Sequence, residues 1–297
     1  MKVDVDTYRG TRVGVPRLQD VLRRHAAGAT FLFTLGTDHT GRAIRRVFRP
    51  GFVKKVSRTS AVEHYGVRTL LYGTLLPGPD IGRSCANILR SVRDAGFEVG
   101  IHSYDHVLWQ DNVAARDRAW TRAEMSRAFA RFSEIFGVPP RTHGAAGWQM
   151  NVHAYELEEE FGFAQASDVR GTCPFLPVFD GHVGRVPQLP TTLPTLDELV
   201  GRDDLTAANV HEEVLSRTAC LSGHHVYTLH AELEGMKWLP VFEQLLSGWR
   251  RQGYELVSIE TLARSLPPGG LPKHDVVRGE VPGRSGTLAV QGELSDR

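Results

Sequence analysis

The segment 30–35, which reads TFLFTL, constrains the fold more than any other stretch of the chain. It holds only apolar residues and threonine, as is typical of a strand buried on both faces of a parallel sheet. A short strand is expected at 2–5. A helix is expected between Pro16 and Gly28, because proline favours the first turn of a helix and glycine its end. Strand, helix and strand at this spacing predict a parallel α/β unit.

The same alternation of strands and helices continues over some 265 residues, which predicts an α/β barrel or a doubly wound sheet. Thr121 and Glu124 form a capping-box sequence that predicts the start of a long helix at 121. Glycine and proline are dense from Pro267 on, which indicates an irregular tail or an extended flap. Further strands are expected at 97–102, 141–145, 164–167, 186–189, 226–230 and 254–257, and further helices at 81–95, 151–161, 207–221, 236–252 and 259–265.

The composition excludes several classes of protein. The net charge of +1 gives no overall field to attract nucleic acid. No apolar run reaches the length needed to cross a bilayer, and the first residues indicate a strand and not a signal peptide. Cys85, Cys173 and Cys220 are scattered and odd in number, so neither a disulfide framework nor a cysteine-rich zinc site is expected. We therefore expect a reduced, cytoplasmic protein.

Chemically active side chains follow the expected strands at their carboxyl ends, where active sites form in parallel α/β folds. They are Asp4, Asp6, His102, His106, Asp168, Arg170 and His230. On a helical turn, histidines at i and i+4 would share one face and could bind one metal ion. Two histidines and one carboxylate leave positions open for water, and the second aspartate could then act as a base. The residues alone leave open an acidic strand end facing water and histidines that only pack in the core or on the surface.

The segment 42–58 concentrates positive charge beside apolar side chains and contains no acid. Such a pattern suits an anionic membrane surface, where apolar groups dip in and cations meet phosphates. The expected contacts are Arg45, Arg46, Phe48, Phe52, Lys54 and Lys55. A solvated helix packed on the core is the alternative.

These motifs together resemble the NodB-homology polysaccharide deacetylase family. The similarity is greatest to one branch, the 4-deoxy-4-formamido-L-arabinose-phosphoundecaprenol deformylases. The segments that carry it span nearly the whole chain: DVDTYRGTRVGVPRL (4–18), GFEVGIHSYDHVLWQ (96–110), AAGW (145–148), SDVRG (167–171), QLPTTLPTLDELVGRD (188–203), VYTLHAELEG (226–235) and VVRG (276–279).

The resemblance implies a distorted, incomplete (β/α) barrel over 1–266, with a basic amphipathic insertion at about 42–76 and a tail or flap at 267–297. It also implies roles for individual residues. Asp4 would be the catalytic base and His230 the catalytic acid. Asp6, His102 and His106 would bind one divalent metal ion, with zinc expected first and cobalt, manganese or nickel as alternatives.

Further residues are expected to contact the substrate, namely Arg9, Trp148, Asp168, Arg170 and Glu232. One departure from the family pattern is visible. Deacetylases of the broader family carry an arginine in a third motif, which holds the base, whereas the corresponding region here reads THGAAGW (142–148). Arg9 and Arg170 are the candidates to replace it, and Trp148 could instead be plain core.

The function implied by the resemblance is removal of a formyl group, as formate, from an aminosugar linked to undecaprenyl phosphate, in the modification of lipid A that confers resistance to cationic peptides. Such an enzyme is expected at the cytoplasmic face of the bacterial inner membrane as a peripheral protein. Two alternatives are a deacetylase of an N-acetylated sugar and a non-catalytic protein that binds polyprenyl phosphates.

Overall fold

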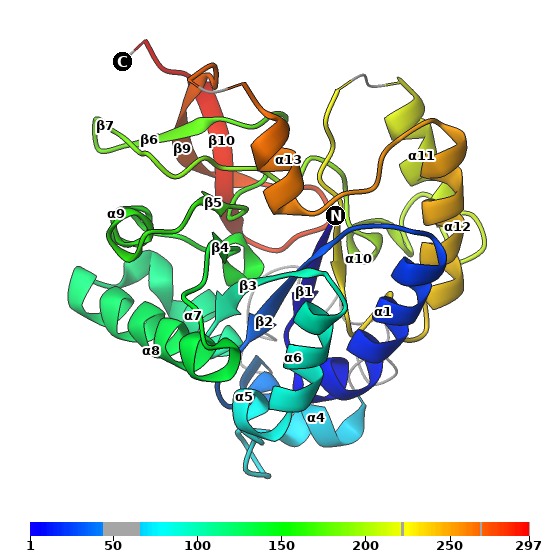
Figure 1. Ribbon diagram of the computed structural model, residues 1–297, viewed down its shortest axis with the longest axis horizontal. Helices are drawn as coiled ribbons and strands as arrows, with labels where there is room; N and C mark the ends of the chain where they lie inside the picture. The colour runs from blue at the N-terminus through cyan, green and yellow to red at the C-terminus, as the bar shows by residue number, and fades with distance from the viewer. Residues whose placement is uncertain (44–65, 221–222, 268, 297) are drawn as a thin grey trace.

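The computed structural model describes residues 1–43, 66–220, 223–267 and 269–296 (Figure 1). Its centre is a six-stranded, parallel sheet in the order β5-β4-β3-β2-β1-β8. These strands are β1 (Lys2–Val5), β2 (Thr30–Thr34), β3 (Glu98–Ser103), β4 (Thr142–His143), β5 (Gln165–Ala166) and β8 (Thr228–His230). Every residue of β1 and β2 is buried, as the uninterrupted run at 30–35 predicts.

The sheet does not close by direct pairing of its outer described strands β5 and β8. An extended segment, 188–193, lies between them instead. The amide of Leu189 donates to Ala166 on one side at 2.7 Å, and that of Thr192 donates to Val226 on the other at 3.1 Å. The expected strand at 186–189 is therefore an irregular connection with isolated bridges and not a regular strand. This arrangement is the distorted, incomplete (β/α) barrel that the family resemblance implied.

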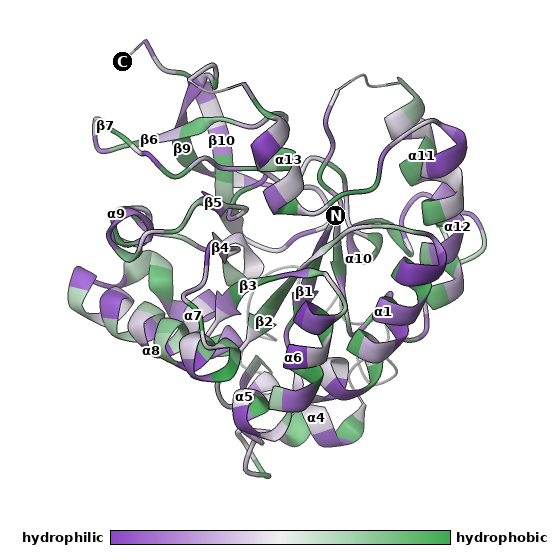
Figure 2. Cartoon of the chain, in the orientation of Figure 1, coloured by the Kyte–Doolittle hydropathy of each residue, from purple (hydrophilic) through white to green (hydrophobic). Residues whose placement is uncertain are grey.

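Helices surround the sheet, and α1, α6 and α8 lie along its outer side (Figure 1). In Figure 2 these helices alternate between polar and apolar residues, whereas β1 and β2 are mostly apolar. The helices longer than six residues are α1 (Val15–Arg24), α6 (Ala86–Asp94), α7 (His106–Asn112), α8 (Arg118–Phe136), α9 (Val152–Phe161), α11 (Val210–Cys220), α12 (Leu239–Arg251) and α13 (Ile259–Ser265). The shorter ones are η1 (Gly10–Gly14), α4 (Val67–Leu71), α5 (Ile81–Ser84), η3 (Val113–Ala115), η4 (Ala146–Trp148) and α10 (Leu196–Leu199).

The start of α8 differs from the prediction. The helix begins at Arg118, and its N-cap is Asp117, whose side chain accepts from the amide of Trp120 at 2.9 Å. The Thr121 hydroxyl donates to the Asp117 carbonyl instead, so the predicted capping box at 121 was wrong. Two cap signals lie one turn apart here, and the earlier one is used. The expected helix at 81–95 is also divided, into α5 and α6, at Cys85.

A second, four-stranded sheet has the order β10-β9-β6-β7. Its members are β6 (Leu176–Phe179), β7 (His182–Val183), β9 (Lys273–Glu280) and β10 (Thr287–Leu294). Where glycine and proline indicated a tail or a flap, β9 and β10 form an antiparallel hairpin. Gln291 of β10 donates its amide to Arg170 at 2.8 Å, which ties the hairpin to the central part of the molecule. The expected strand at 254–257 is an extended stretch without regular pairing.

The chain elements around the carboxyl ends of the central strands include α4 and α5 (Figure 1). None of the helices in the described part of the chain is both long enough and apolar enough to cross a membrane. The basic and aromatic side chains that we expect at a membrane surface lie outside the described residues, namely Arg45, Arg46, Phe48, Phe52, Lys54 and Lys55.

Candidate active site

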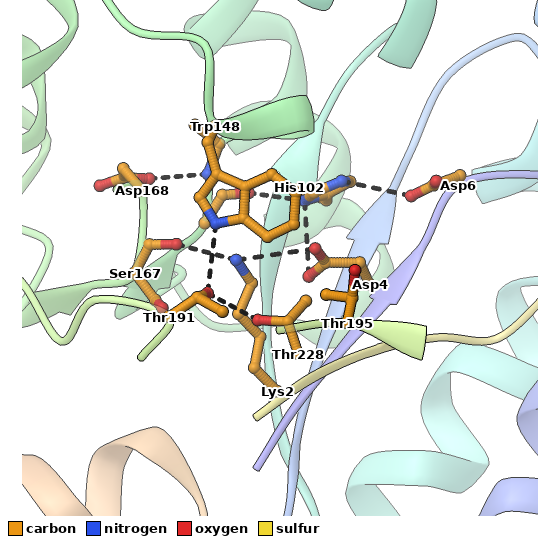
Figure 3. Close-up of polar contacts among 12 residues, drawn as sticks. Lys2, Asp4, Asp6, His102, Trp148, Ser167, Asp168, Thr191, Thr195 and Thr228 are labelled. Carbon is orange, nitrogen blue, oxygen red and sulfur yellow. Dashed lines mark hydrogen bonds and ion pairs between the residues drawn. The ribbon is translucent and has the colours of Figure 1, made fainter. Parts of the chain in front are cut away.

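Asp6, His102 and His106 meet at the carboxyl ends of β1 and β3, as the resemblance implied. One ligand atom from each lies within 4.8 Å of the other two. Asp6 directly follows β1, His102 belongs to β3, and His106 is the first residue of α7. Figure 3 shows Asp6 and Asp4 reaching His102 from different directions. This convergence of two imidazoles and one carboxylate is the donor set of a catalytic divalent ion.

A β-bulge sets the direction of the His102 side chain. In the pairing of β2 with β3, Phe33 lies opposite Ile101, and the next pair joins Thr34 to Ser103. His102 is therefore the surplus residue of β3. An extra residue in one strand locally re-aims its side chain, and bulges occur often beside active sites. The sequence gives no direct sign of this bulge, because it depends on the register between two strands.

His106 reaches the same point from the start of a helix. Asp105 is the N-cap of α7 and accepts from the amide of Leu108 at 3.0 Å. Its other oxygen lies 2.5 Å from Nδ1 of His39. The two imidazoles, with centroids 5.3 Å apart, are thus brought together by a strand, a turn and a helix start. They do not share one helical turn, the arrangement considered for this spacing, but they do lie close together.

Hydrogen bonding fixes which nitrogen of His102 faces the site. Its Nδ1 lies 2.6 Å from the carbonyl oxygen of Gly144, which leaves Nε2 toward Asp6 Oδ1 at 3.2 Å. Nε2 of His106 lies 3.5 Å from Asp6 Oδ2. Burial opposes the charge of Asp6, but His106 and His102 outweigh it and hold the pKa of Asp6 well below its usual value. The contact of His102 Nδ1 with the Gly144 carbonyl is of the kind that orients metal-binding histidines, whose other nitrogen binds the ion.

Several buried polar atoms at this end of the sheet have no hydrogen-bond partner within the described ranges. They are Asp4 Oδ1, Asp6 Oδ1, His230 Nδ1 and Glu232 Oε2. Buried polar atoms are nearly always satisfied, so these atoms indicate groups that a bound partner completes. Together with the donor set, this fits a metal ion and a polar substrate at the site.

Asp4 lies on β1 beside the metal-ligand candidates. Its Oδ1 is 3.8 Å from His102 Nδ1, and its Oδ2 is 3.6 Å from the ammonium nitrogen of Lys2. The side chain is almost fully buried. A carboxylate held beside an open metal site without being one of its three closest ligands is placed to accept a proton.

His230 ends β8, the strand next to β1, and its Cα is in register with that of Asp4. Paired residues of parallel strands point to the same side of a sheet, so base and acid candidates share one side. The His230 amide donates to Glu234 Oε2 at 2.9 Å. Tyr227 donates its hydroxyl to the other Glu234 oxygen at 3.0 Å, and burial raises the pKa of Glu234 to about 7.

Glu232 supports the loop after β1. Its Oε1 accepts from the amide of Asp6 at 3.1 Å and from the amide and hydroxyl of Thr7 at 2.8 and 2.7 Å. A Cβ at Gly10 would lie 1.9 Å from the same oxygen, so only glycine permits this approach. Arg9 lies next to Gly66, with its Nη1 3.0 Å from the position that a Cβ there would occupy. Glu232 and Arg9 therefore both lie near the loop that carries Asp6.

Trp148, Asp168 and Arg170, which we expected to contact the substrate, are all buried. Trp148 is 2% exposed, so its ring packs in the interior as the core alternative anticipated. Cations lie over this ring, with centroid distances of 5.3 Å for Lys2, 5.1 Å for Arg170 and 4.6 Å for Arg284. Arg170 is 2.5 Å from Glu198 and also donates to the carbonyls of Thr191 and Leu193.

A second group of metal-ligand types lies in the interior and was not predicted. His143 Nδ1 is 2.7 Å from Glu158 and 2.9 Å from Asp168. Asp168 Oδ1 also accepts from the amide of Ala145 at 2.7 Å. Burial opposes a charged imidazole, but Asp168 and Glu158 outweigh it and raise the pKa of His143 to about 10. The histidine within the THGAAGW segment was the available signal.

A sequence profile of the polysaccharide deacetylase family matches residues 6–166, and the chain therefore belongs to this family of hydrolases. A protein of Shewanella sediminis named probable 4-deoxy-4-formamido-L-arabinose-phosphoundecaprenol deformylase ArnD is 38% identical over 298 residues, which cover 100% of this chain and 95% of that protein. A protein of the same name in Wigglesworthia glossinidia brevipalpis is 30% identical and covers 96% of this chain and 99% of its own length. The family resemblance predicted from the sequence is confirmed.

The fold comparison agrees with this assignment. A solved structure described as a polysaccharide deacetylase of Mycobacterium smegmatis superposes with a TM-score of 0.63. The two chains are 17% identical, and the alignment covers 94% of each. The predicted fold class, an α/β fold with an incomplete barrel of parallel strands, is likewise confirmed.

Proposed function

We propose that this protein is a metal-dependent deformylase. It removes the formyl group, as formate, from 4-deoxy-4-formamido-L-arabinose linked to undecaprenyl phosphate, in the modification of lipid A with aminoarabinose. The observation that carries the proposal is the convergence of Asp6, His102 and His106 beside Asp4 and His230 at one end of the sheet. Similarity to named deformylases over the whole chain supports the choice of substrate.

The donor set and the unpartnered atoms fit a divalent ion, with zinc expected first. Asp6, His102 and His106 would hold it. When bound, such an ion polarises a carbonyl oxygen and lowers the pKa of a water molecule. Its identity among zinc, cobalt, manganese and nickel is not fixed by these donors.

Asp4 and His230 carry out the proton transfers of the proposed reaction. Asp4 accepts a proton from the attacking water at Oδ1, which has no hydrogen-bond partner in the described structure. Water oxygen bonds to the formyl carbon, and the bond from that carbon to the sugar nitrogen breaks. His230 donates a proton to this nitrogen, so formate and a free amine leave. These roles are supported by the pairing of Asp4 with His230 on the neighbouring strands β1 and β8.

A lipid-linked substrate requires an interfacial enzyme, and we propose peripheral attachment to an anionic membrane. The basic segment 42–58 would meet lipid phosphates. In the described part, Val67 and Leu75 of the following stretch are 63% and 80% exposed. Reversing the charges of Arg45, Arg46, Lys54 and Lys55 should abolish co-sedimentation with anionic vesicles, and unchanged co-sedimentation would rule the attachment out.

The deformylase proposal is tested by formate release from the lipid-linked formamido sugar. Metal-stripped protein should be inactive, and one metal equivalent should restore activity. The Asp4→Asn variant should keep one metal ion but lose about 10³-fold in kcat, because the base is gone. His182→Gln is a matched control at an exposed histidine and should behave as wild type. Ordinary turnover by Asp4→Asn would refute the base assignment.

Two other results would replace the proposal. Faster release of acetate from an N-acetylated oligosaccharide would identify a deacetylase. Tight binding of the lipid-linked sugar without hydrolysis at any metal content would identify a binding protein.

A further inference from the structure

We propose that Lys2 is the positioning residue for the catalytic base. The inference rests on the proposed function, because it assigns Lys2 a role through Asp4. The Lys2 side chain is fully buried, and its ammonium nitrogen lies 3.6 Å from Asp4 Oδ2. It donates to the carbonyl of Ser167 at 2.9 Å and lies 5.3 Å from the ring centroid of Trp148. Figure 3 shows the ammonium between these groups.

The strand itself explains how a lysine comes to this place. Lys2 and Asp4 are two residues apart on β1, so their side chains leave the same side of the sheet. β1 pairs with β2 and β8, which prevents it from turning outward to hydrate the ammonium. An ammonium buried without compensation would cost several kcal/mol. Among the described residues, Asp4 is the acid that the structure places within ion-pair distance of Lys2.

The contact divides the two oxygens of Asp4 between different tasks. Oδ2 faces the cation, whereas Oδ1 has no hydrogen-bond partner in the described structure and lies 3.8 Å from His102. An anchored oxygen limits rotation of the carboxylate, so the other oxygen keeps its position beside the His102 ring. The ammonium of Lys2 contacts Asp4, Ser167 and the Trp148 ring, none of which is assigned to the metal, so Lys2 is a positioning residue and not a catalytic one.

The cation is itself held by elements far along the chain. Ser167 follows β5, and its neighbour Asp168 accepts from the amide of Ala145. Trp148 donates its indole N–H to Thr191 at 3.2 Å. These contacts give the ammonium a fixed position, as a supporting shell requires. Arg170, which the sequence suggested for holding the base, instead contacts Glu198 and two backbone carbonyls.

The first test replaces the ammonium by a neutral chain of similar length. Lys2→Met should lower kcat by about 10- to 100-fold, as is typical for loss of a supporting group. KM should change by less than about 3-fold, and metal analysis should still find one ion per chain. Lys273→Met on β9 is the matched control and should change neither value. Unchanged kcat, or loss of the metal, would overturn the inference.

A double-mutant cycle shows whether Lys2 acts through Asp4. In the Asp4→Asn background, Lys2→Met should reduce the residual rate by less than about 2-fold, because no base remains to be positioned. Equal losses in both backgrounds would mean a general structural role and would overturn the inference. Should Lys2→Met not fold, Lys2→Gln takes its place, since its amide can still donate to Ser167.

A cycle on thermal unfolding tests the ion pair without any assay of activity. Lys2→Met should lower the melting temperature of metal-free protein by about 5 °C, because it leaves the Asp4 carboxylate buried without its cation. The same change in Asp4→Asn protein should lower it by less than half as much. Additive shifts would overturn the pair itself. A wild type that releases no formate would instead refute the proposed function, and with it the catalytic part of this inference.

Discussion

Two groups of histidine and carboxylate lie in this molecule, and they have similar donors but different surroundings. Asp6, His102 and His106 meet at the carboxyl ends of the central strands. The second group, formed by His143, Glu158 and Asp168, is also compact enough to hold an ion by distance alone. Donor type and spacing therefore do not distinguish a metal site from an internal network.

The difference lies in how the hydrogen-bonding capacity is used. In the first group, the side chains of Asp6 and His106 are 11% and 17% exposed, and the 3.2 Å contact of Asp6 Oδ1 with His102 Nε2 lacks the geometry of a hydrogen bond. In the second, Asp168 also accepts from Ala145 and from Gln188, and the charged imidazole of His143 contacts both carboxylates. The first group is chemically incomplete, whereas the second is satisfied by a proton in place of a metal.

The second group also supports the first. Asp168 fixes the amide of Ala145, and the preceding carbonyl, that of Gly144, orients His102 through Nδ1. A sealed ion cluster thus holds the backbone that selects the tautomer of a metal-ligand candidate. Histidine and carboxylate side chains can therefore form a binding site where solvent and ligand can enter, or a buried network that supports such a site where they cannot.

The largest expected effect comes from removing a ligand of the open group. His106→Ala should lose the bound metal and lower formate release by at least about 10³-fold, because two remaining donors hold a catalytic ion poorly. Metal analysis and formate assays check this result, with exposed His182→Ala as the control. An ion retained at full occupancy would remove the distinction between the two groups.

The sealed group should instead affect stability. His143→Gln should lower the free energy of unfolding by about 3–5 kcal/mol, because the buried carboxylate of Asp168 loses its counter-ion and Glu158 loses a hydrogen-bond partner. Bound metal should stay at one ion per chain. Denaturant unfolding together with metal analysis measures both, and His153→Gln on α9 is a control at a half-buried histidine. A metal ion lost with His143 would show that this group is a ligand site.

Removal of the metal should separate the two groups in the wild type. A ligand at 100 times its Kd stabilises a folded protein by about 2.7 kcal/mol, which corresponds to about 5 °C in a chain of this size. A chelator should therefore lower the melting temperature of wild type and His143→Gln alike, and leave that of His106→Ala unchanged. A chelator shift that persists in His106→Ala would point to an ion held elsewhere.

The smallest expected effect is on the pH dependence of the free energy of unfolding. The pKa of His143 rises from 6.5 to about 10 on folding, so its stabilising contribution is complete below pH 6.5 and is lost as the pH rises through 10. Burial also raises the pKa of Glu158, with the same sign. Between pH 7 and 10, wild type should lose stability more steeply than His143→Gln in denaturant titrations. Parallel curves would contradict a charged imidazole.

The α/β class and the polar edge of the sheet could be predicted because they depend on local patterns, whereas the incomplete barrel and the roles within the open group came from the family resemblance. The apolar run at 30–35 predicts a buried strand, and polar residues after strands predict the active edge. The bulge at His102, the burial of Lys2 and the network of His143 depend on register and on partners more than forty residues away in several cases. Sequence periodicity carries no record of such pairings. The predicted start of α8 was wrong because Asp117 and Thr121 are competing N-cap residues, and the helix uses Asp117.

The surplus residue in β3 has a consequence for any attempt to build the HSYDH motif (102–106) into another protein. Because the first imidazole sits on the surplus position of β3 and the second at the helix start beyond it, regular pairing of β2 and β3 through His102 would change the direction of the first side chain relative to its partners. The spacing of the two histidines therefore does not specify the site without the register of β3 against β2. A scaffold that copies the letters HSYDH into an unbroken strand would reproduce the motif and lose the chemistry.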